Sequence, residues 1–163
     1  MTRAQKTVSN IGDTVIVHES ETLDQLFGYH LKRAMNVFQM DLKQTLKPFD
    51  LRMLTYTALV MIVENPGLRQ SQLAHAMEVE RPNMVVIIDT LENRELITRD
   101  PVVTDRRAYA LNATLAGRRL AEKATIAVRT HEERLLHAVP PERRESVIAA
   151  LTLIRTIGGG ETT

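Results

Sequence analysis

The hydrophobic period of the chain changes from helical to strand-like after Arg94, and this change constrains the fold more than any other feature. Before it, apolar residues recur at steps of three and four, the period of an amphipathic helix. After it come two short β-like runs at 96–99 and 107–111, which are typical of strands. Residues 100–106, between them, are too many for a tight turn. The pattern predicts a mainly α fold with a small β-hairpin, in the α+β class.

Six helices are expected around this hairpin, and proline, glycine or a capping residue bounds most of them. Asp50 is a plausible N-cap of the second helix, Pro82 is tolerated in the first turn of the fourth, and Thr114 can cap the fifth. The first helix is longer than a small core needs, which suggests a dimerisation element. The expected helices cover about 22–46, 52–64, 70–77, 81–94, 114–137 and 142–157.

These elements predict one domain over 21–158 with two lobes. Two short helices, a three- or four-residue turn and a hairpin make a winged helix-turn-helix lobe, expected at about 50–113. The helices at about 22–46 and 114–157 would form a helical dimerisation lobe. Residues 1–20 are weakly patterned and are predicted to be an arm of uncertain order, and 159–163 a flexible tail.

Composition excludes several classes of function. The 163 residues include no cysteine, which excludes disulfides, thiolate metal sites and cysteine redox sensing. Neither a signal peptide nor an apolar run of about 18 residues occurs, so a cytoplasmic protein without a membrane partner is expected. His131 and His137 do not share a helix face, so no metal site is predicted, and nothing indicates a cofactor.

The fourth helix carries the candidate DNA-reading residues. In helix-turn-helix proteins the second helix of the motif offers its N-terminal residues to base edges in the major groove. Asparagine can bind adenine, arginine can bind guanine, and valine or proline can contact a thymine methyl group. The candidates are Arg81, Pro82, Asn83, Val86 and Thr90. The remaining apolar positions are predicted to be core: Met84, Val85, Ile87, Ile88 and Leu91.

The hairpin carries a second candidate contact, Asp105-Arg106-Arg107. A carboxylate can hold one guanidinium and leave the other free to reach a phosphate or a narrow minor groove. An ordinary surface ion pair is the alternative interpretation. The chain has a net charge of only +1, and residues 66–107 hold six arginines against seven acids, so the position of each arginine matters more than bulk charge.

The combined motifs resemble those of the MarR family of bacterial transcriptional regulators. Each motif is weak alone, but their spacing fits together, and the similarity covers about 23–157. The motifs are Leu73-Ala74, Leu91-Glu92, Leu96-Ile97-x-Arg99, Asp105-Arg106-Arg107 and Thr114-x-x-Gly117.

The resemblance implies a two-fold homodimer that binds a palindromic double-stranded DNA operator, with half-sites about one helical turn apart. Ser71 would contact a phosphate, with Arg69 and Gln70 alongside, and Arg99 is grouped with the DNA contacts. The family usually represses adjacent genes until a small aromatic or phenolic acid, or a derivative, relieves repression.

In proteins that this chain resembles, the effector lies between the dimerisation helices and the DNA-binding lobe. Candidate residues are Tyr29, His30, Arg33, Arg52 and Tyr56. An anionic group, free or on a thioester, could pair with Arg33 or Arg52. The alternative is that His30 and Tyr56 are core residues and that Arg33 and Arg52 are solvated.

Two departures from the family pattern stand out. Glu95 occupies a position that is commonly glycine, and a left-handed residue there would cost glutamate about 1 kcal/mol, so a different helix exit is expected. Val86 replaces a position that is frequently polar or basic, and Pro82 one that is often serine, so an operator sequence cannot be transferred. The absence of cysteine excludes sensing by thiol oxidation.

Two other functions were weighed. A winged-helix module used only for protein–protein contact remains an alternative, since the chain has little net positive charge. An enzyme is not predicted, because no nucleophile–base set, phosphate-binding glycine loop or paired carboxylate site occurs, and Gly158-Gly159-Gly160 follows a helix rather than a strand.

Overall fold

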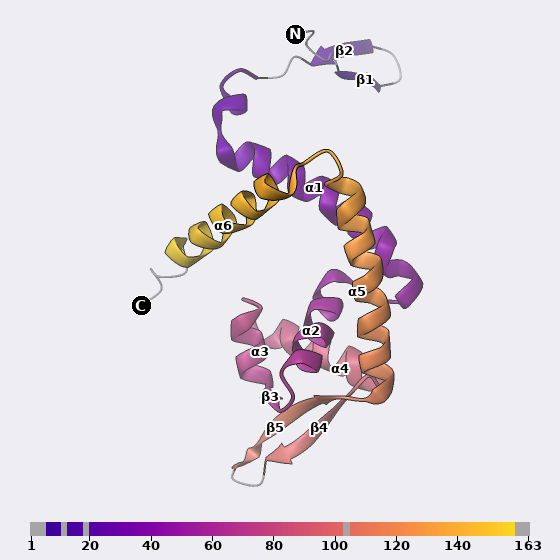
Figure 1. The fold of residues 1–163 in the computed structure, drawn as a ribbon. Coiled ribbons are helices and arrows are strands. Elements are labelled where there is room, and N and C mark those ends of the chain that lie inside the picture. The colour runs from indigo at the N-terminus through magenta and orange to yellow at the C-terminus, as the bar shows by residue number, and fades with distance from the viewer. Residues whose placement is uncertain (1–5, 11–12, 18–19, 103–104, 159–163) are drawn as a thin grey trace. The chain divides into compact units, whose positions relative to one another are not determined.

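The computed structural model describes residues 6–10, 13–17, 20–102 and 105–158, with side chains described for 20–102 and 109–157 (Figure 1). Its elements, in chain order, are β1 (Lys6–Asn10), β2 (Asp13–Val17), the 3-10 helix η1 (Leu23–Gln25), α1 (Phe27–Leu46), the 3-10 helix η2 (Lys47–Phe49), α2 (Met53–Glu64), β3 (Leu68–Arg69), α3 (Gln70–Ala76), α4 (Arg81–Asn93), β4 (Ile97–Val102), β5 (Asp105–Ala113), α5 (Leu115–Leu135) and α6 (Pro141–Gly158).

The chain divides into two units, residues 1–40 and 41–163. In the first unit, β1 and β2 pair as an antiparallel hairpin in which Lys6 opposes Val17 and Asn10 opposes Asp13. The apolar run Val15-Ile16-Val17 is therefore strand, within a segment that the sequence predicted as an arm of uncertain order.

The six predicted helices are present, and their ends differ by a few residues. The largest shift is at the start of α1, because residues 23–25 form a 3-10 turn and Leu26 is extended, with ψ 118°. Asp50 was predicted as the N-cap of α2, and this was wrong. It ends η2 in a left-handed conformation with φ 50°, and Arg52 is the N-cap residue.

The small sheet has three antiparallel strands in the order β3-β5-β4. Pairing of β4 with β5 extends to Val102 opposite Asp105, so the prediction that the connection was too long for a tight turn was wrong. The strand β3 was not predicted, because two residues carry no period. Its Leu68 lies opposite Leu111 of β5. The mainly α fold with a small β wing is confirmed.

The core lies among α2, α3, α4, the sheet and the inner face of α5. Its fully buried large side chains are Leu46, Leu59, Ile62, Leu73, Met84, Ile88, Leu91, Ile97 and Leu111. These come from the end of α1 and from α2, α3, α4, β4 and β5, so α4 and the wing are held by one continuous set of contacts. No helix among the described residues is long and apolar enough to span a membrane.

Candidate nucleic-acid interface

The turn between α3 and α4 sets the direction in which α4 leaves the helix pair. Glu78 has φ 52°. Its N–H donates to the carbonyl of His75 at 3.1 Å, and that of Val79 donates to Ala74 at 3.0 Å. This is the paired hydrogen-bond pattern of a Schellman motif, with Glu78 in the left-handed position that glycine usually takes. The motif ends α3 and leads directly into α4.

Helix α4 divides into a buried and an exposed face. It begins at Arg81, with Pro82 in its first turn, where no intrahelical donor is lost. The buried face consists of Met84, Ile87, Ile88 and Leu91. Val85 was predicted to be core, and this was wrong, because it is 43% exposed.

The exposed face of α4 has the composition of a base-reading surface. All five candidates, Arg81, Pro82, Asn83, Val86 and Thr90, are exposed. Val86 is 65% exposed. The hydroxyl of Thr90 donates to the Val86 carbonyl at 2.7 Å, which leaves its oxygen free to accept. The face therefore offers one cation, one amide and apolar surface to a ligand.

Helix α4 ends in the geometry that glycine would favour, although the residue is Glu95, with φ 57°. Glu95 N–H donates to Glu92 at 2.8 Å and Leu96 N–H donates to Leu91 at 3.0 Å, a second Schellman motif. Leu91 and Leu96 are both buried. The expectation of a different exit was therefore wrong: the buried leucines hold the left-handed turn despite its cost to glutamate.

The motif Thr114-x-x-Gly117 joins the wing to α5. The hydroxyl of Thr114 accepts from Gly117 N–H at 3.0 Å and donates to the Glu95 carbonyl at 2.8 Å. A Cβ on residue 117 would lie 2.0 Å from the Leu96 carbonyl oxygen. Glycine is thus required for close approach, and the motif ties the exit of α4 to the start of α5.

Arg99 connects the wing to α4. Its guanidinium, on β4, hydrogen-bonds the Asp89 carboxylate, and its Nε lies 3.4 Å from Glu92 Oε2. The Arg99 side chain is 26% exposed, so it is largely committed to these carboxylates. Sequence reasoning grouped Arg99 with DNA contacts and missed both partners, although Asp89 and Glu92 are spaced to share a helix face.

The other wing candidates lie at the end of the hairpin. The backbone of Asp105, Arg106 and Arg107 belongs to β5, and their side chains lie outside the described residues. Near the third helix, Ser71 is exposed at the second residue of α3. The N–H of Arg69 donates to Gln72 Oε1 at 2.9 Å, which caps that helix. Gln70, between them, is partly buried.

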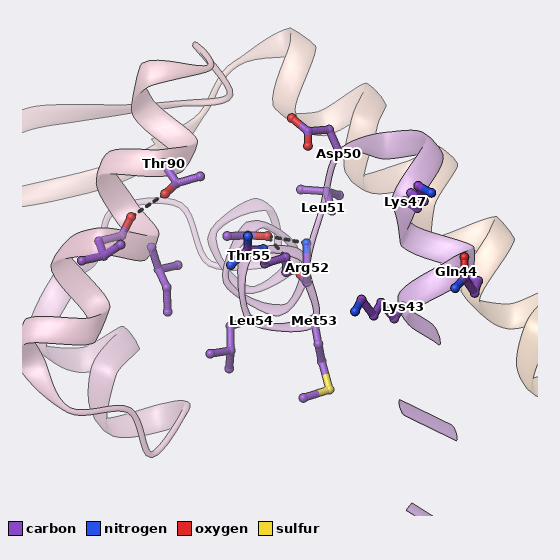
Figure 2. Close-up of a pocket in the computed structure, with 12 residues that line it drawn as sticks. Lys43, Gln44, Lys47, Asp50, Leu51, Arg52, Met53, Leu54, Thr55 and Thr90 are labelled. Atoms are coloured by element: carbon purple, nitrogen blue, oxygen red, sulfur yellow. Dashed lines mark hydrogen bonds between the residues drawn. The ribbon is translucent and has the colours of Figure 1, made fainter. Parts of the chain in front are cut away.

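Beside α4 lies a pocket of about 850 Å³, which Figure 2 shows from close by. It is bounded by the C-terminal end of α1, the start of α2 and the exposed edge of α4. Three of its lining residues are cationic: Lys43 on α1, Lys47 on η2 and Arg52, the N-cap residue of α2. The lining residues are Lys43, Gln44, Lys47, Asp50, Leu51, Arg52, Met53, Leu54, Thr55, Val86, Ile87 and Thr90.

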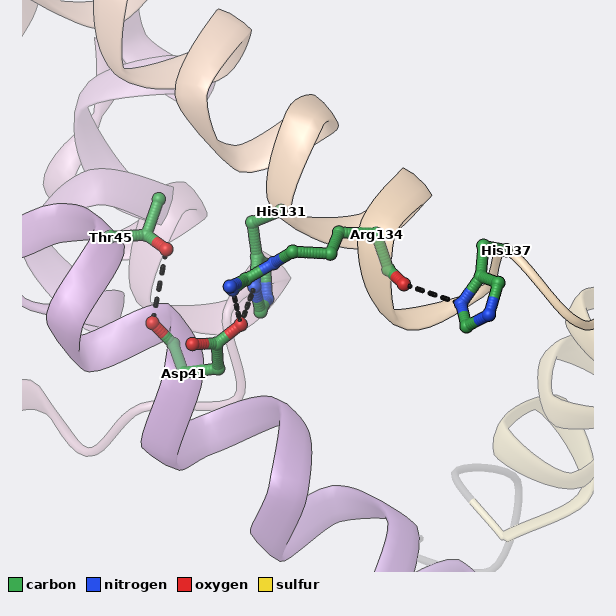
Figure 3. A network of polar contacts seen from close by, with 5 residues as sticks. All are labelled: Asp41, Thr45, His131, Arg134 and His137. Atoms are coloured by element: carbon green, nitrogen blue, oxygen red, sulfur yellow. Dashed lines mark hydrogen bonds and ion pairs between the residues drawn. The ribbon is translucent and has the colours of Figure 1, made fainter.

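A buried histidine joins the end of α1 to α5 (Figure 3). His131 is 4% exposed, and its Nδ1 lies 2.8 Å from Asp41 Oδ2. The Arg134 guanidinium donates to the same carboxylate oxygen. The hydrogen bond from His131, followed by that from Arg134, lowers the pKa of Asp41 below its ordinary value. His131 is therefore a buried residue of α5 that contacts the end of α1.

The five predicted effector residues fall in two groups. Tyr29, His30 and Arg33 lie together on α1: the two rings meet edge to face with centroids 5.8 Å apart, and Arg33 Cζ is 5.5 Å from the tyrosine centroid. Arg52 and Tyr56 lie at the start of α2. The Tyr56 hydroxyl is 3.1 Å from Thr125 Oγ1, so its polar end has a partner within the chain.

Comparisons with known proteins agree with this geometry. The MarR family model matches residues 51–109. A transcriptional repressor, CouR, bound to a 23-mer DNA duplex is 32% identical with a TM-score of 0.81, covering 85% of this chain and 98% of that chain. CouR from Rhodococcus jostii RHA1 bound to p-coumaroyl-CoA is 26% identical with a TM-score of 0.74, covering 88% and 99%.

A curated relative gives a shorter match. The chain is 38% identical over 91 residues to a protein of Thauera aromatica assigned as the transcriptional regulatory protein for an hcr operon. The match spans 55% of each protein, about half the length of that relative. The family match falls on the helix-turn-helix and wing, and the similarity to the CouR–DNA structure extends over most of the chain. This chain therefore belongs to the MarR family of DNA-binding transcriptional regulators.

Proposed function

We propose that this protein is a homodimeric repressor that binds a palindromic DNA operator and releases it when a small aromatic acid or its derivative binds. The observation that carries the proposal is the exposed edge of α4, where Arg81, Asn83 and Val86 project beside a hairpin wing. Proteins of the MarR family are regulators and not enzymes, so no reaction is proposed. The predicted cytoplasmic location follows from DNA as the partner.

The roles of the DNA contacts follow from side-chain chemistry. Asn83 and Arg81 would read base edges in the major groove, and Val86 would contact a thymine methyl group. Ser71 would donate to a phosphate at the start of α3, where backbone N–H groups lack helical partners. Arg106 and Arg107 would extend from the wing toward the adjacent minor groove. Arg99 would position the wing and not contact DNA directly, because its ion pairs with Asp89 and Glu92 on α4 fix the angle of the wing.

The proposed homodimer is supported by apolar surface that the chain leaves uncovered. No described residue of α6 is buried. Its exposed apolar side chains are Val147, Ile148, Leu151, Leu153, Ile154 and Ile157. Large exposed apolar surfaces on soluble proteins mark association sites, and a second copy covering α6 would form an isologous interface.

The class of effector is supported by solved relatives. CouR is bound to p-coumaroyl-CoA in one of them, and a Mycobacterium tuberculosis MarR family protein is bound to salicylic acid in another. Both ligands carry an aromatic ring and an anionic group. We extend this class to the present chain, with Tyr29, His30, Arg33, Arg52 and Tyr56 as candidate contacts.

The test is fluorescence anisotropy with DNA from the region upstream of the protein's own gene, at two salt concentrations. Tight binding to one palindromic fragment over random DNA, weakening steeply with salt, is expected. Replacing Arg106 and Arg107 with alanine should lower affinity at least about tenfold and reduce the salt slope. The matched control, Arg129→Ala with Arg143→Ala, removes the same charge from exposed positions on α5 and α6 and should change little.

Equal affinity for the fragment and for random DNA, across a genome-wide set of fragments, would contradict the repressor proposal. It would favour a winged-helix module for protein contact. Unchanged operator binding by the Arg106 and Arg107 variant would contradict the wing assignment alone.

A further inference from the structure

The two faces of the wing can be assigned from the register of its strands. Directly opposed residues of an antiparallel pair share a face, and so do residues two apart along one strand. Arg99 lies opposite Leu111, and Pro101 lies opposite Tyr109, so these four residues share one face. Arg99 pairs with Asp89 of α4, and Leu111 is fully buried. This inner face of the wing is therefore turned toward the helices.

The outer face of the wing is closed by its own hydrogen bonds. Asp100 and Asn112 belong to it, because they alternate with Arg99 and Leu111 along the strands. Asp100 Oδ2 accepts from Asn112 Nδ2 at 2.7 Å and from Thr98 Oγ1 at 3.3 Å. The polar side chains of the outer face thus bond one another across the two strands.

On the inner face, Tyr109 presents an aromatic ring that carries a hydroxyl. Tyr109 is 50% exposed, and Pro101 opposite it is exposed as well. Among residues 20–102 and 109–157, none hydrogen-bonds the Tyr109 hydroxyl, whereas the Tyr56 hydroxyl lies 3.1 Å from Thr125 Oγ1. Tyrosine is enriched at binding surfaces because one end of the side chain is apolar and the other is polar. Both parts of Tyr109 can therefore contact a partner outside the chain.

The start of α3 lies on the other side of Tyr109. Strand β3 pairs with β5 through Arg69, which is opposite Ala110, and α3 begins at the next residue, Gln70. The first turn of α3 carries the exposed Ser71, and α3 and β5 are in contact. Tyr109 is therefore placed between the wing and the helix-turn-helix.

This position corresponds to one strand of the DNA backbone. With α4 in the major groove and the wing at the adjacent minor groove, the surface between them faces the sugar–phosphate strand that separates the two grooves. That strand alternates apolar deoxyribose with anionic phosphate. We infer that Tyr109 binds it, with the ring and Pro101 against a deoxyribose and the hydroxyl donating to a neighbouring phosphate. The inference rests on the proposed function, because it requires α4 and the wing to occupy neighbouring grooves.

A contact of this kind sets the position of the protein on DNA and carries no sequence information. Because tyrosine is neutral, its removal releases no additional counterion, so the salt dependence of binding should be unchanged. Removal of Arg106 and Arg107, in contrast, is expected to reduce that dependence. The two kinds of wing contact are therefore distinguishable in one assay.

The first experiment measures anisotropy on the upstream fragment and on a random duplex of equal length, at two salt concentrations. Tyr109→Phe should bind both DNAs about tenfold more weakly, because a hydrogen bond to a charged group is lost. Tyr109→Ala should lose more, since the ring is removed as well. The salt slope should match wild type in both variants. The matched control is Thr98→Val, which removes a hydroxyl from the outer face and should bind as wild type.

The second experiment replaces single phosphates of the upstream fragment with neutral methylphosphonates. At one phosphate in each half-site, the replacement should weaken wild-type binding at least about threefold but have little effect on Tyr109→Phe, since the two changes remove the same contact. Urea unfolding should give the same midpoint for wild type and Tyr109→Phe.

Wild-type DNA affinity in both Tyr109 variants would overturn the inference, and would favour a protein partner for this surface. Equal losses in wild type and Tyr109→Phe at every phosphate would also overturn it, as would a changed preference among bases. Because the random duplex tests the contact without an operator, a Tyr109 effect on both DNAs without preference for the upstream fragment would contradict the repressor proposal alone.

Discussion

Residues 51–113 and helix α6 bury their apolar side chains to opposite extents. All but three of the buried core residues lie in 51–113, the exceptions being Leu46, Ala121 and Ala124. In α6, no described residue is buried, although six large apolar side chains occur there. The first region is stabilised by contacts within the chain, whereas the apolar side chains of the second are left exposed by the described residues of the chain.

This difference separates the two functions proposed for the protein. The DNA-reading face needs a rigid support, and the continuous core beneath α4 provides it. Association needs apolar surface that stays exposed until a partner covers it, and α6 has this composition. Substitutions in the two regions should therefore change different observables.

The largest expected effect is from Gly117→Ala, at the start of α5, where the backbone packs against Leu96 of the core-supported region. The added Cβ would lie 2.0 Å from the Leu96 carbonyl oxygen, so the backbone at the start of α5 must move. We expect the free energy of unfolding to fall by about 3 kcal/mol, measured by urea unfolding at fixed protein concentration. The control is Gly28→Ala in α1, where a Cβ meets no atom within 4 Å. It should be neutral or stabilising by up to about 1 kcal/mol. Equal losses of stability in both variants would mean that the close approach of residue 117 to Leu96 is not what requires glycine.

The next prediction concerns α6. Ile154→Asp places a charge on an exposed apolar face, which should be tolerated in one copy but oppose burial between two copies. The sedimentation mass is expected to fall from twice 18.4 kDa to 18.4 kDa. Far-UV circular dichroism should retain its helical signal.

Thr156→Asp introduces the same charge at an exposed polar position on α6, and it should remain dimeric. A wild-type mass of 18.4 kDa at micromolar concentration would refute the proposed dimer.

A smaller effect is expected at the contact between α1 and α5. Hydrogen bonds from His131 and Arg134 lower the pKa of Asp41 in the folded protein. A lowered pKa means that this stabilisation is complete above the ordinary carboxyl pKa, about 3.9, and is lost as pH falls through the folded value. Asp41→Asn should therefore lower Tm at pH 7, and the two melting curves should converge below about pH 4. The control Glu122→Gln should leave Tm nearly unchanged, and a constant difference at every pH would argue against the carboxylate.

The smallest prediction tests the exit of α4. Glu95→Gly should raise the free energy of unfolding by up to about 1 kcal/mol, because glycine adopts φ 57° without the left-handed penalty. The larger entropy of glycine in the unfolded chain reduces the gain. Glu122→Gly, in the interior of α5, should instead lose about 1 kcal/mol. Equal effects in both variants would mean that residue 95 is not left-handed in solution.

Sequence alone was sufficient for the six helices, the hairpin wing and the exposure of Val86. These features depend on period, capping and turn residues, all of which are local. The same reasoning selected Arg81 and Asn83 at the start of α4, because the position of a residue in a helix-turn-helix follows from helix boundaries. It also identified the MarR motifs, whose spacing is a property of the chain order.

Tertiary structure decided what local patterns leave open. Glu95 is left-handed because Leu91 and Leu96 are buried together, a gain that outweighs the local preference of glutamate. Arg99 faces Asp89 and Glu92 because β4 folds back along α4, and Asp41 meets His131 because α1 and α5 are in contact. The pocket beside α4 likewise combines residues 43–55 with residues 86–90 of α4, which are distant in sequence. Periodicity assigns a residue to a face of its own element, but its partner is set by the packing of different elements, which depends on the whole buried core.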